Sequence, residues 1–442
     1  MGKLRSILLC LCAVAGLWNA TAQNYYTLQS CLAVGLEQNY AIRIAQGEEQ
    51  IASNNVTLGN AGFLPEIGFS AGYGFDLTDS RSVVRADGSR VSDHGFNQSL
   101  TAGLDVSWTI FEGLQVQTNY KRLQEMERMG EIATRIAVED FVASLAAEYY
   151  NYVQQRIRLK NFLYAVSLSR ERLRIVEVRY KVGNYSRLDL QQARVDFNAD
   201  SSQYISQQEA VEASRIRLNE LMANPDVNAP LTVFDTMIDL REHLDWATLL
   251  DGMLQTNAAL LQAERSRTLV ELDLKTVQSR NYPYLRANAG YGYSLNTYGS
   301  SSNSNRRRHQ WGPDAGVTLG ITIFDGNRRR ENLNARIAVD NAKLEEAQLE
   351  QSLRADLADF WQAYENNQKL LILERGNLGA AKENYEIARE RYELGDLSGI
   401  EMREAQKSLL DAEERILVAE YNTKLCEISL MQISGKVLSY LK

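Results

Sequence analysis

The stretch of sequence that decides the fold runs Glu66-Ile67-Gly68-Phe69-Ser70-Ala71-Gly72-Tyr73-Gly74-Phe75-Asp76-Leu77. Its odd-numbered positions are apolar, and its even-numbered positions are polar or glycine. Because successive side chains of a strand point to opposite faces, each set occupies one face of a β-strand. The same alternation recurs over 99–110, 285–295 and 315–323. The sequence therefore predicts four amphipathic strands.

These strands suit a lipid bilayer. Each is close to the ~9–11 residues that a tilted strand needs to cross the hydrocarbon, and aromatic side chains near the strand ends suit an interfacial girdle. A water-soluble sheet is the alternative, but it needs apolar helices to cover it, and most helices of this chain have their own apolar stripe. We therefore expect the apolar faces to contact lipid. The polar segments 79–97 and 298–313 are expected to be loops.

The chain is duplicated at about half its length. Thr27 and Asp245 each begin a helical segment, and Asn39 and Asn257 follow at the same offset. Further matched segments are Ala71-Gly72-Tyr73-Gly74-Phe75 with Ala289-Gly290-Tyr291-Gly292-Tyr293, Phe111-Glu112-Gly113 with Phe324-Asp325-Gly326, and Arg179-Tyr180-Lys181-Val182-Gly183 with Arg391-Tyr392-Glu393-Leu394-Gly395. Each half is thus predicted to run helix, strand, loop, strand, long helix, turn, helix.

Two proline-free stretches, 114–224 and 326–442, permit long helices. Within them an apolar stripe advances by three, four and seven residues, as in supercoiled helix pairs. The stripe consists of Leu145, Tyr149, Tyr152, Leu159, Leu163, Val166, Leu173 and Tyr180 in the first half and of Leu357, Trp361, Tyr364, Leu371, Leu378, Tyr385 and Tyr392 in the second. At ~1.5 Å per residue each long helix would measure roughly 100 Å. A tube across a periplasm needs such a length, and a globular domain does not.

Each long helix is predicted to end in a tight turn to a second helix. Both turns have a glycine for a left-handed cap, a serine for the next N-cap, and an acid three residues later, as in a capping box. These residues are Gly183, Ser186 and Asp189 in the first turn and Gly395, Ser398 and Glu401 in the second. The pattern predicts two helical hairpins.

The chain has 442 residues, a net charge of -8, 24% charged and 45% apolar residues, which excludes a disordered chain and a bundle of membrane helices. Lys3 and Arg5, an apolar run and Ala20-Thr21-Ala22 have the order of a cleavable secretory signal. The acidic balance gives no support for nucleic acid as a partner. No later apolar segment reaches the roughly 18–20 residues of a membrane helix, so a membrane segment would have to be built from strands.

Residues for catalysis or metal binding are scarce. His94, His243 and His309 are scattered, and no nucleophile or carboxylate stands at a diagnostic spacing from them. Cys31 and Cys426 remain after removal of the signal; two free thiols are the simpler expectation, and a disulfide after export is the alternative. No enzymatic activity, cofactor or metal is expected.

These observations divide the chain into consecutive segments. They are a signal peptide at 1–22, a first-repeat short helix at 23–63, strands 1 and 2 at 64–112 with an extracellular loop at 79–97, tunnel hairpin 1 at 113–222 with its tip at 182–186, an equatorial linker at 223–244, a second-repeat short helix at 245–281, strands 3 and 4 at 282–325 with an extracellular loop at 298–313, tunnel hairpin 2 at 326–435 with its tip at 394–398, and a C-terminal tail at 436–442.

Four strands cannot close a barrel, because the smallest membrane barrels need about eight. An open sheet edge in lipid costs several kcal/mol for each unpaired backbone group, so the chain must assemble. Two copies would give a barrel whose interior is normally filled by side chains, whereas the Gly-, Ser- and Thr-rich polar faces favour a wider ring. The expected fold is mixed α and transmembrane β: a trimeric 12-stranded β-barrel, four strands per chain, continued by a long α-helical coiled-coil tunnel.

At this point the sequence resembles the TolC-like outer-membrane efflux protein family, also called outer-membrane factors. The resemblance covers essentially the whole mature chain. Its specific part is the motif Arg-Tyr-x-x-Gly-x-x-Ser that begins at Arg179 and at Arg391, followed in register by Ala193 and Ala405. It implies a homotrimer in the outer-membrane lipid of a Gram-negative bacterium, extending into the periplasm. It also implies partners, namely a periplasmic membrane-fusion adaptor and an inner-membrane pump of the RND or ABC type.

The resemblance also implies two sets of site residues. The adaptor-docking tips would be Val182, Gly183, Asn184, Ser186, Leu394, Gly395, Asp396 and Ser398. The periplasmic gate would consist of Asp189, Tyr392, Glu401 and Glu404. Glu401 and Glu404 share one helix face, so three copies would crowd six carboxylates around one axis, attract cations and raise some pKa values. The alternative is that these acids only favour a helix start.

One residue departs from the family pattern. Some members place an arginine two residues after the second-turn glycine, where this chain has Leu397, and Arg187 is the nearest candidate to replace it. The expected function is passive export through the exit duct of a tripartite efflux or type I secretion system, gated at the periplasmic tips. The alternative, a periplasmic coiled-coil adaptor or scaffold, accounts for the helices but not for the strands.

Overall fold

The computed structural model describes residues 25–84, 86–88, 90–241, 244–299 and 307–441, so the predicted signal peptide and His243 lie outside the described residues. The chain divides into two compact units. The strand unit consists of Ala45–Thr134 and Ala259–Leu349, and the hairpin unit consists of Met1–Ile44, Arg135–Ala258 and Glu350–Lys442.

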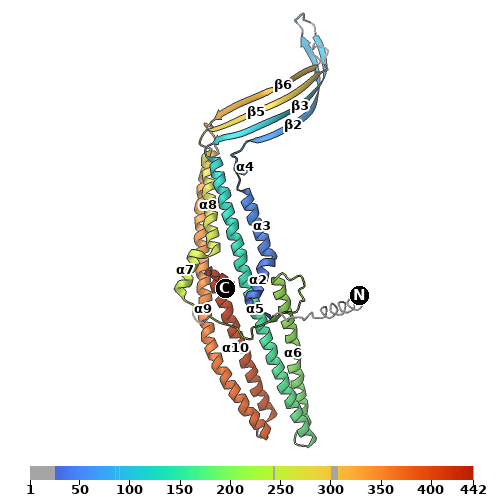
Figure 1. The fold of residues 1–442 in the computed structure, drawn as a ribbon, viewed down its shortest axis with the longest axis vertical. Helices are drawn as coiled ribbons and strands as arrows, with labels where there is room; N and C mark the ends of the chain where they lie inside the picture. Colours follow the sequence, from blue (N-terminus) through green and yellow to red (C-terminus); the bar gives the residue numbers. More distant parts are fainter. Residues whose placement is uncertain (1–24, 85, 89, 242–243, 300–306, 442) are drawn as a thin grey trace, which may run out of the picture. The chain divides into compact units, whose positions relative to one another are not determined.

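The strand unit contains one four-stranded antiparallel sheet in the order β2-β3-β5-β6 (Figure 1). Its strands are β2 (Glu66–Val84), β3 (Arg90–Glu112), β5 (Tyr284–Tyr298) and β6 (Arg307–Gly320). The register pairs Ile67 with Val106, Val106 with Ala289, and Ala289 with Ala315, so apolar side chains form rows on one face. The four predicted strands and their apolar face are confirmed. Within the described residues β2 and β6 are the sheet's open edges.

The loops expected at 79–97 and 298–313 are much shorter than predicted. β2 and β3 stay paired as far as Val84 and Arg90, and β6 begins at Arg307. Sequence polarity misled the prediction, because a strand ladder is held by backbone hydrogen bonds and tolerates polar side chains on both faces. Pro313 lies inside β6, which is possible because an edge strand has one side that needs no donor.

The fourth strand, expected at 315–323, ends at Gly320. Its last partner is Tyr284, the first residue of β5. Pro283 precedes Tyr284 and has no backbone N–H to continue the ladder. Ile321 and Ile323 therefore leave the sheet, although their spacing continued the apolar face.

Two helical hairpins that repeat one another form most of the hairpin unit, and the longer helix of each begins within the strand unit (Figure 1). The first joins α5 (Gln115–Lys181) to α6 (Arg187–Leu221), and the second joins α9 (Arg328–Leu394) to α10 (Gly399–Ile433). The predicted apolar stripe is only partly buried within one chain. Leu145 and Tyr385 are buried, whereas Leu163 and Tyr180 are exposed. In the part of the chain that the structure describes, none of the helices combines the length and the apolar character needed to cross a membrane.

The single short helix expected in each repeat is broken. Residues 23–63 contain β1 (Tyr25–Tyr26), α2 (Leu28–Gln38), α3 (Tyr40–Asn55) and α4 (Leu58–Ala61), and residues 245–281 contain α7 (Trp246–Thr256) and α8 (Ala258–Ser279). Thr27 and Asp245 are the predicted N-caps of α2 and α7.

Asn39 and Asn257 cause the breaks, at equivalent places in the two repeats. Both have extended backbone, with ψ of 127° and 121°. The amide Nδ2 of Asn39 donates to the Leu221 carbonyl at 3.0 Å, and that of Asn257 donates to the Ile433 carbonyl at 2.9 Å. Each asparagine thereby fixes its helix break to the end of α6 or α10.

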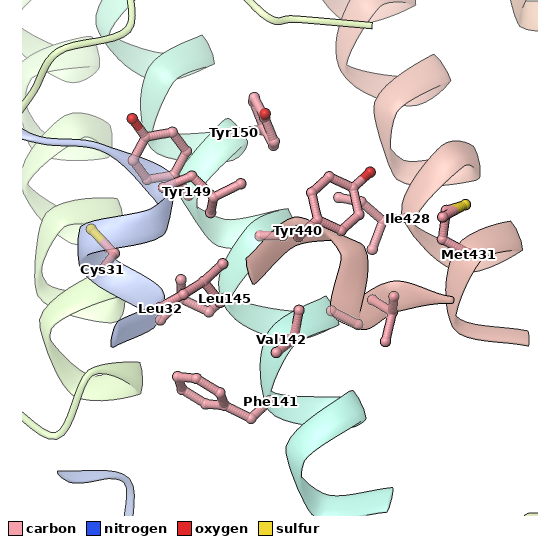
Figure 2. Close-up of a cluster of buried hydrophobic side chains, with 14 of the residues drawn as sticks. Cys31, Leu32, Phe141, Val142, Leu145, Tyr149, Tyr150, Ile428, Met431 and Tyr440 are labelled. Atoms are coloured by element: carbon pink, nitrogen blue, oxygen red, sulfur yellow. The ribbon is translucent and has the colours of Figure 1, made fainter. Parts of the chain in front are cut away.

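The main core lies where α2, α5, α10 and the C-terminal 3-10 helix η1 (Val437–Leu441) meet (Figure 2). Leu32, Leu145 and Tyr149 are completely buried there. Cys31 and Cys426 are buried free thiols, so the simpler of the two expectations holds. The linker joins this core through β4 (Thr232–Val233), which pairs in parallel with β1.

A buried ion pair fastens the linker and the C-terminal segment to α10. Glu427, fully buried, accepts hydrogen bonds from Lys424 Nζ at 2.9 Å and from the Tyr440 hydroxyl at 2.6 Å. Its second oxygen accepts the Arg241 backbone N–H at 3.1 Å. A buried carboxylate needs hydrogen-bond donors, and Tyr440 of the C-terminal segment supplies one of them. The segment expected to be a tail at 436–442 is therefore a docked 3-10 helix.

Candidate functional site: the paired hairpin turns

The two hairpin turns have the same backbone. Gly183 and Gly395 have φ of +85° and +90°, the left-handed conformation that glycine adopts without strain. The next residue, Asn184 or Asp396, closes each turn by donating its N–H at 2.9 Å to the carbonyl of Arg179 or Arg391. The duplicated sequence thus produces a duplicated helix stop, as predicted.

Both predicted capping boxes are present. The Asp189 N–H donates to Ser186 Oγ at 3.2 Å, and the Ser186 N–H donates to Asp189 Oδ2 at 2.9 Å. Glu401 and Ser398 repeat these bonds at 3.2 and 2.9 Å. Hydrogen bonds from the serine lower the pKa of both carboxyls. Both acids therefore stay charged at neutral pH while they hold the helix start.

The other gate candidates have different surroundings in the chain. Glu404 is exposed on α10, one turn beyond Glu401. Tyr392 is buried, and burial raises its pKa to about 12. The carboxylate of Asp189 bonds Ser186, while the ring of Tyr392 packs against Arg179. Asp189 and Tyr392 thus make different contacts, and Glu404 has the carboxylate that is not engaged in a cap.

The eight predicted tip residues are all exposed in the chain. Val182 and Leu394, which occupy the same place in the two turns, are 66% and 79% exposed. Leu188 and Ile400, just past the turns, are equally open. Each turn thus presents apolar side chains that the single chain leaves uncovered.

Arg179 joins the two turns, and the sequence analysis missed it. Its guanidinium lies over the rings of Tyr185 and Tyr392, 5.4 and 5.2 Å from their centroids. Nη1 donates to the Tyr185 hydroxyl at 3.0 Å, and Nη2 donates to the carbonyls of Tyr392 at 3.1 Å and Glu393 at 3.3 Å. Arg187, the candidate proposed from the sequence, is an exposed first residue of α6. The sequence signal that could have pointed to Arg179 was the Arg-Tyr pair that recurs before both turns.

Ion pairs join the hairpins farther from the turns. Arg403 on α10 binds Asp200 on α6 through two bonds of 2.7 Å, and Arg158 on α5 binds Glu414 on α10. These partners lie more than 200 residues apart, so no sequence spacing predicted them. Among the described residues, no group of three or more His, Cys, Asp or Glu side chains could hold a metal ion.

The fold and the paired turns agree with a known family. The family model "Outer membrane efflux protein" matches residues 34–224 and 249–436, one match for each repeat. The chain belongs to this family, whose members are efflux channels of the outer membrane. The predicted localisation in the outer membrane is confirmed by this membership. The alternative of a periplasmic adaptor finds no support.

Individual relatives are distant but cover nearly the whole chain. The outer membrane protein TolC of Vibrio cholerae is 22% identical over 401 residues, 88% of this chain and 86% of that protein. The probable efflux pump outer membrane protein TtgC of Pseudomonas putida is 21% identical over 92% of this chain and 82% of its own. The solved Campylobacter jejuni CmeC outer membrane channel has a TM-score of 0.76 at 17% identity, with 92% of this chain and 85% of that chain covered.

Proposed function

We propose that three copies of this chain form a passive exit duct, a 12-stranded barrel continued by a helical tunnel. The open edges of the sheet are the observation that supports this most directly. β2 and β6 each have one unpaired side, and apolar side chains such as Phe69, Leu77 and Trp311 are exposed on the sheet. In lipid, each unpaired backbone group costs several kcal/mol, so β6 of one copy pairs with β2 of the next.

The helices support the same assembly. Each hairpin exposes apolar residues that the chain itself does not cover, such as Val195 and Ile205 on α6 and Ile372 and Ile387 on α9. Burying such side chains gives about 1.5–3 kcal/mol each. A ring in which α6 and α9 of neighbouring copies meet would bury them and close a tunnel wall.

The tips carry the partner contacts and the gate in this proposal. The exposed apolar residues Val182 and Leu394 fit a periplasmic adaptor protein that links the duct to an inner-membrane pump of the RND or ABC type. Glu404 and Glu401 narrow the periplasmic end, and Asp189 and Tyr392 shape the turns behind them. The duct has no catalytic role, and the pump supplies the energy for export. The adaptor favours opening because its contacts with the tips are more favourable in the open state.

Assembly and conduction together test this function. The mature chain, purified from outer membranes in detergent, should have the native mass of a trimer and should form ion-conducting channels in planar bilayers. A strain without the chain should become more sensitive to exported toxic compounds, and the chain should restore resistance. A folded monomer that stays soluble in detergent-free buffer would contradict the proposal.

A further inference from the structure

The second hairpin carries a counterpart of Arg179, but within a single chain this residue does not make the equivalent contact. Arg391 stands at the same place in the last turn of α9 as Arg179 does in α5, immediately before the same turn. It is exposed and donates no hydrogen bond to any described side chain or carbonyl. Within the chain its positive charge helps to lower the pKa of Glu401 on α10, but its guanidinium does not form the stacking and carbonyl contacts that Arg179 makes.

The tyrosine that would receive Arg391 is uncovered as well. Tyr392, covered by Arg179, is 2% exposed, whereas its repeat counterpart Tyr180 is 40% exposed. The two tyrosines follow their arginines directly and precede equivalent glycines. Their different exposure has one cause: Tyr392 of the second hairpin is covered by Arg179 of the first hairpin, whereas no arginine of the second hairpin covers Tyr180 within the chain.

We propose that Arg391 stacks on Tyr180 of the adjacent copy and donates to the carbonyls of that copy's Tyr180 and Lys181. The inference rests on the proposed ring, in which first and second hairpins alternate. Within a chain, Arg179 of the first hairpin reaches the carbonyls of Tyr392 and Glu393 on the second. Because the hairpins are repeats, the second hairpin reaches the next copy's first hairpin in the same way.

This contact between copies is weaker than the contact within a chain. The aromatic partner Tyr185, two residues after Gly183, is replaced by Leu397 after Gly395, so Arg391 has one ring to pack on where Arg179 has two. The receiving helix end carries Lys181 in place of Glu393, which adds a like charge near the guanidinium. The seams between copies are therefore where the tips separate first.

Chemical cross-linking tests the contact directly. A chain with Arg391→Cys and Tyr180→Cys is treated with a short bismaleimide in native outer membranes, and the parent chain, with its buried Cys31 and Cys426, gives the background. The expected products on a denaturing gel are covalent dimers and trimers. The matched pair Arg179→Cys with Tyr392→Cys should link within one chain and leave the mass on the gel monomeric.

Channel recordings test the consequence. Arg391→Ala should raise the open fraction in planar bilayers about tenfold, which corresponds to a loss of about 1.4 kcal/mol. Arg389→Ala, an exposed arginine on the same turn that pairs with Glu386 and Glu393, is the control and should change little. An assembled trimer without cross-links between copies, or with an unchanged open fraction, overturns this contact alone. A chain that stays monomeric overturns the proposed function with it.

Discussion

Arg403 binds Asp200 through two parallel hydrogen bonds of 2.7 Å, each guanidinium nitrogen to one carboxylate oxygen, and so joins the second hairpin to the first. Asp200 is only 2% exposed, and Arg403 is more open. A bidentate pair of this kind is directional as well as strong. It holds α10 against α6 and fixes the rotation of one hairpin relative to the other.

Mutations of the two residues of this pair should lower the unfolding free energy by different amounts. Arg403→Ala leaves a buried carboxylate without its counter-charge and should cost about 3 kcal/mol of unfolding free energy. Asp200→Asn leaves an arginine that water can reach, so it should cost clearly less. Urea unfolding in detergent, followed by circular dichroism, measures both. Equal losses for the two variants would show that burial of Asp200 is not the cause.

The turn glycines should be sensitive to the smallest possible change. Gly183→Ala or Gly395→Ala forces an L side chain into a left-handed conformation and should cost roughly 1–2 kcal/mol, although open space surrounds both glycines. Gly376 on α9 is exposed, also in open space, and helical. Gly376→Ala is the matched control and should stabilise the chain by about 0.8–1.0 kcal/mol. Thermal unfolding of the three variants separates backbone strain from side-chain crowding; a stabilised Gly183→Ala variant would contradict the prediction.

The sequence was sufficient to predict the structure wherever a local pattern determines a local element. Period-two alternation located the sheet, and Ser186 with Asp189 located a helix start, because each needs only neighbouring residues. The ends of strands were less predictable. β6 ends at Gly320 because Pro283 stops the partner strand, and that information lies far from the apolar pattern of β6 itself.

Contacts between the repeats could not be predicted from a sequence alone. Arg179 was visible as part of a repeated motif, but its partners Tyr185 and Tyr392 are set by how two hairpins pack. The carboxylates of Asp189 and Glu401 show the converse. The resemblance placed them in a gate, and the structure shows what each does inside one chain, which is to cap its own helix.

Acid should loosen the turns. The pKa values of Asp189 and Glu401 lie below those of the free carboxyls, so the caps contribute stability above the unfolded-state pKa values and lose it as pH falls through the folded-state values. Hydrogen exchange of the amides of Ser186 and Ser398, compared at pH 7 and at progressively lower pH, should show rising opening only in the acidic range. Ser398→Ala removes the hydroxyl but keeps the backbone N–H that bonds Glu401, so it should reduce this pH dependence at the second turn without abolishing it and leave it intact at the first.

Glu404 should matter more than Glu401 for the passage of ions. Glu401 is held back by Ser398, with its carboxylate 2.7 Å from the hydroxyl, whereas Glu404 is exposed one turn further along α10. Glu404→Gln should therefore change the single-channel conductance and weaken block by divalent cations in planar bilayers. Glu401→Gln should act mainly on the turn. If the Glu404→Gln channel matched the parent in both conductance and block, the carboxylates would not form the constriction.

Two aspartates on the polar face of the sheet should make the barrel prefer cations. Asp105 pairs across β3 and β5 with Gly290, and Gly290 pairs with Asp314 on β6, so both carboxylates lie in one row. A Cβ placed on Gly290 would lie 2.8 Å from Asp314 Oδ1, which shows that this carboxylate lies over the glycine backbone of the next strand. In the proposed trimer the row becomes a ring of six carboxylates at one level of the lumen.

Asp105→Asn with Asp314→Asn should therefore lower the ratio of cation to anion permeability, most clearly at low salt where screening is weak. Asn288, which pairs with Ser107, lies in the adjacent row of the same face. Asn288→Asp should shift the ratio the opposite way, because it adds charge at a neighbouring level without removing the ring. Reversal potentials under a salt gradient measure both changes. Equal potentials for the parent and the double variant would show that the polar face of the sheet does not line the conducting path, since charges that bound a pore must act on the ions that pass it.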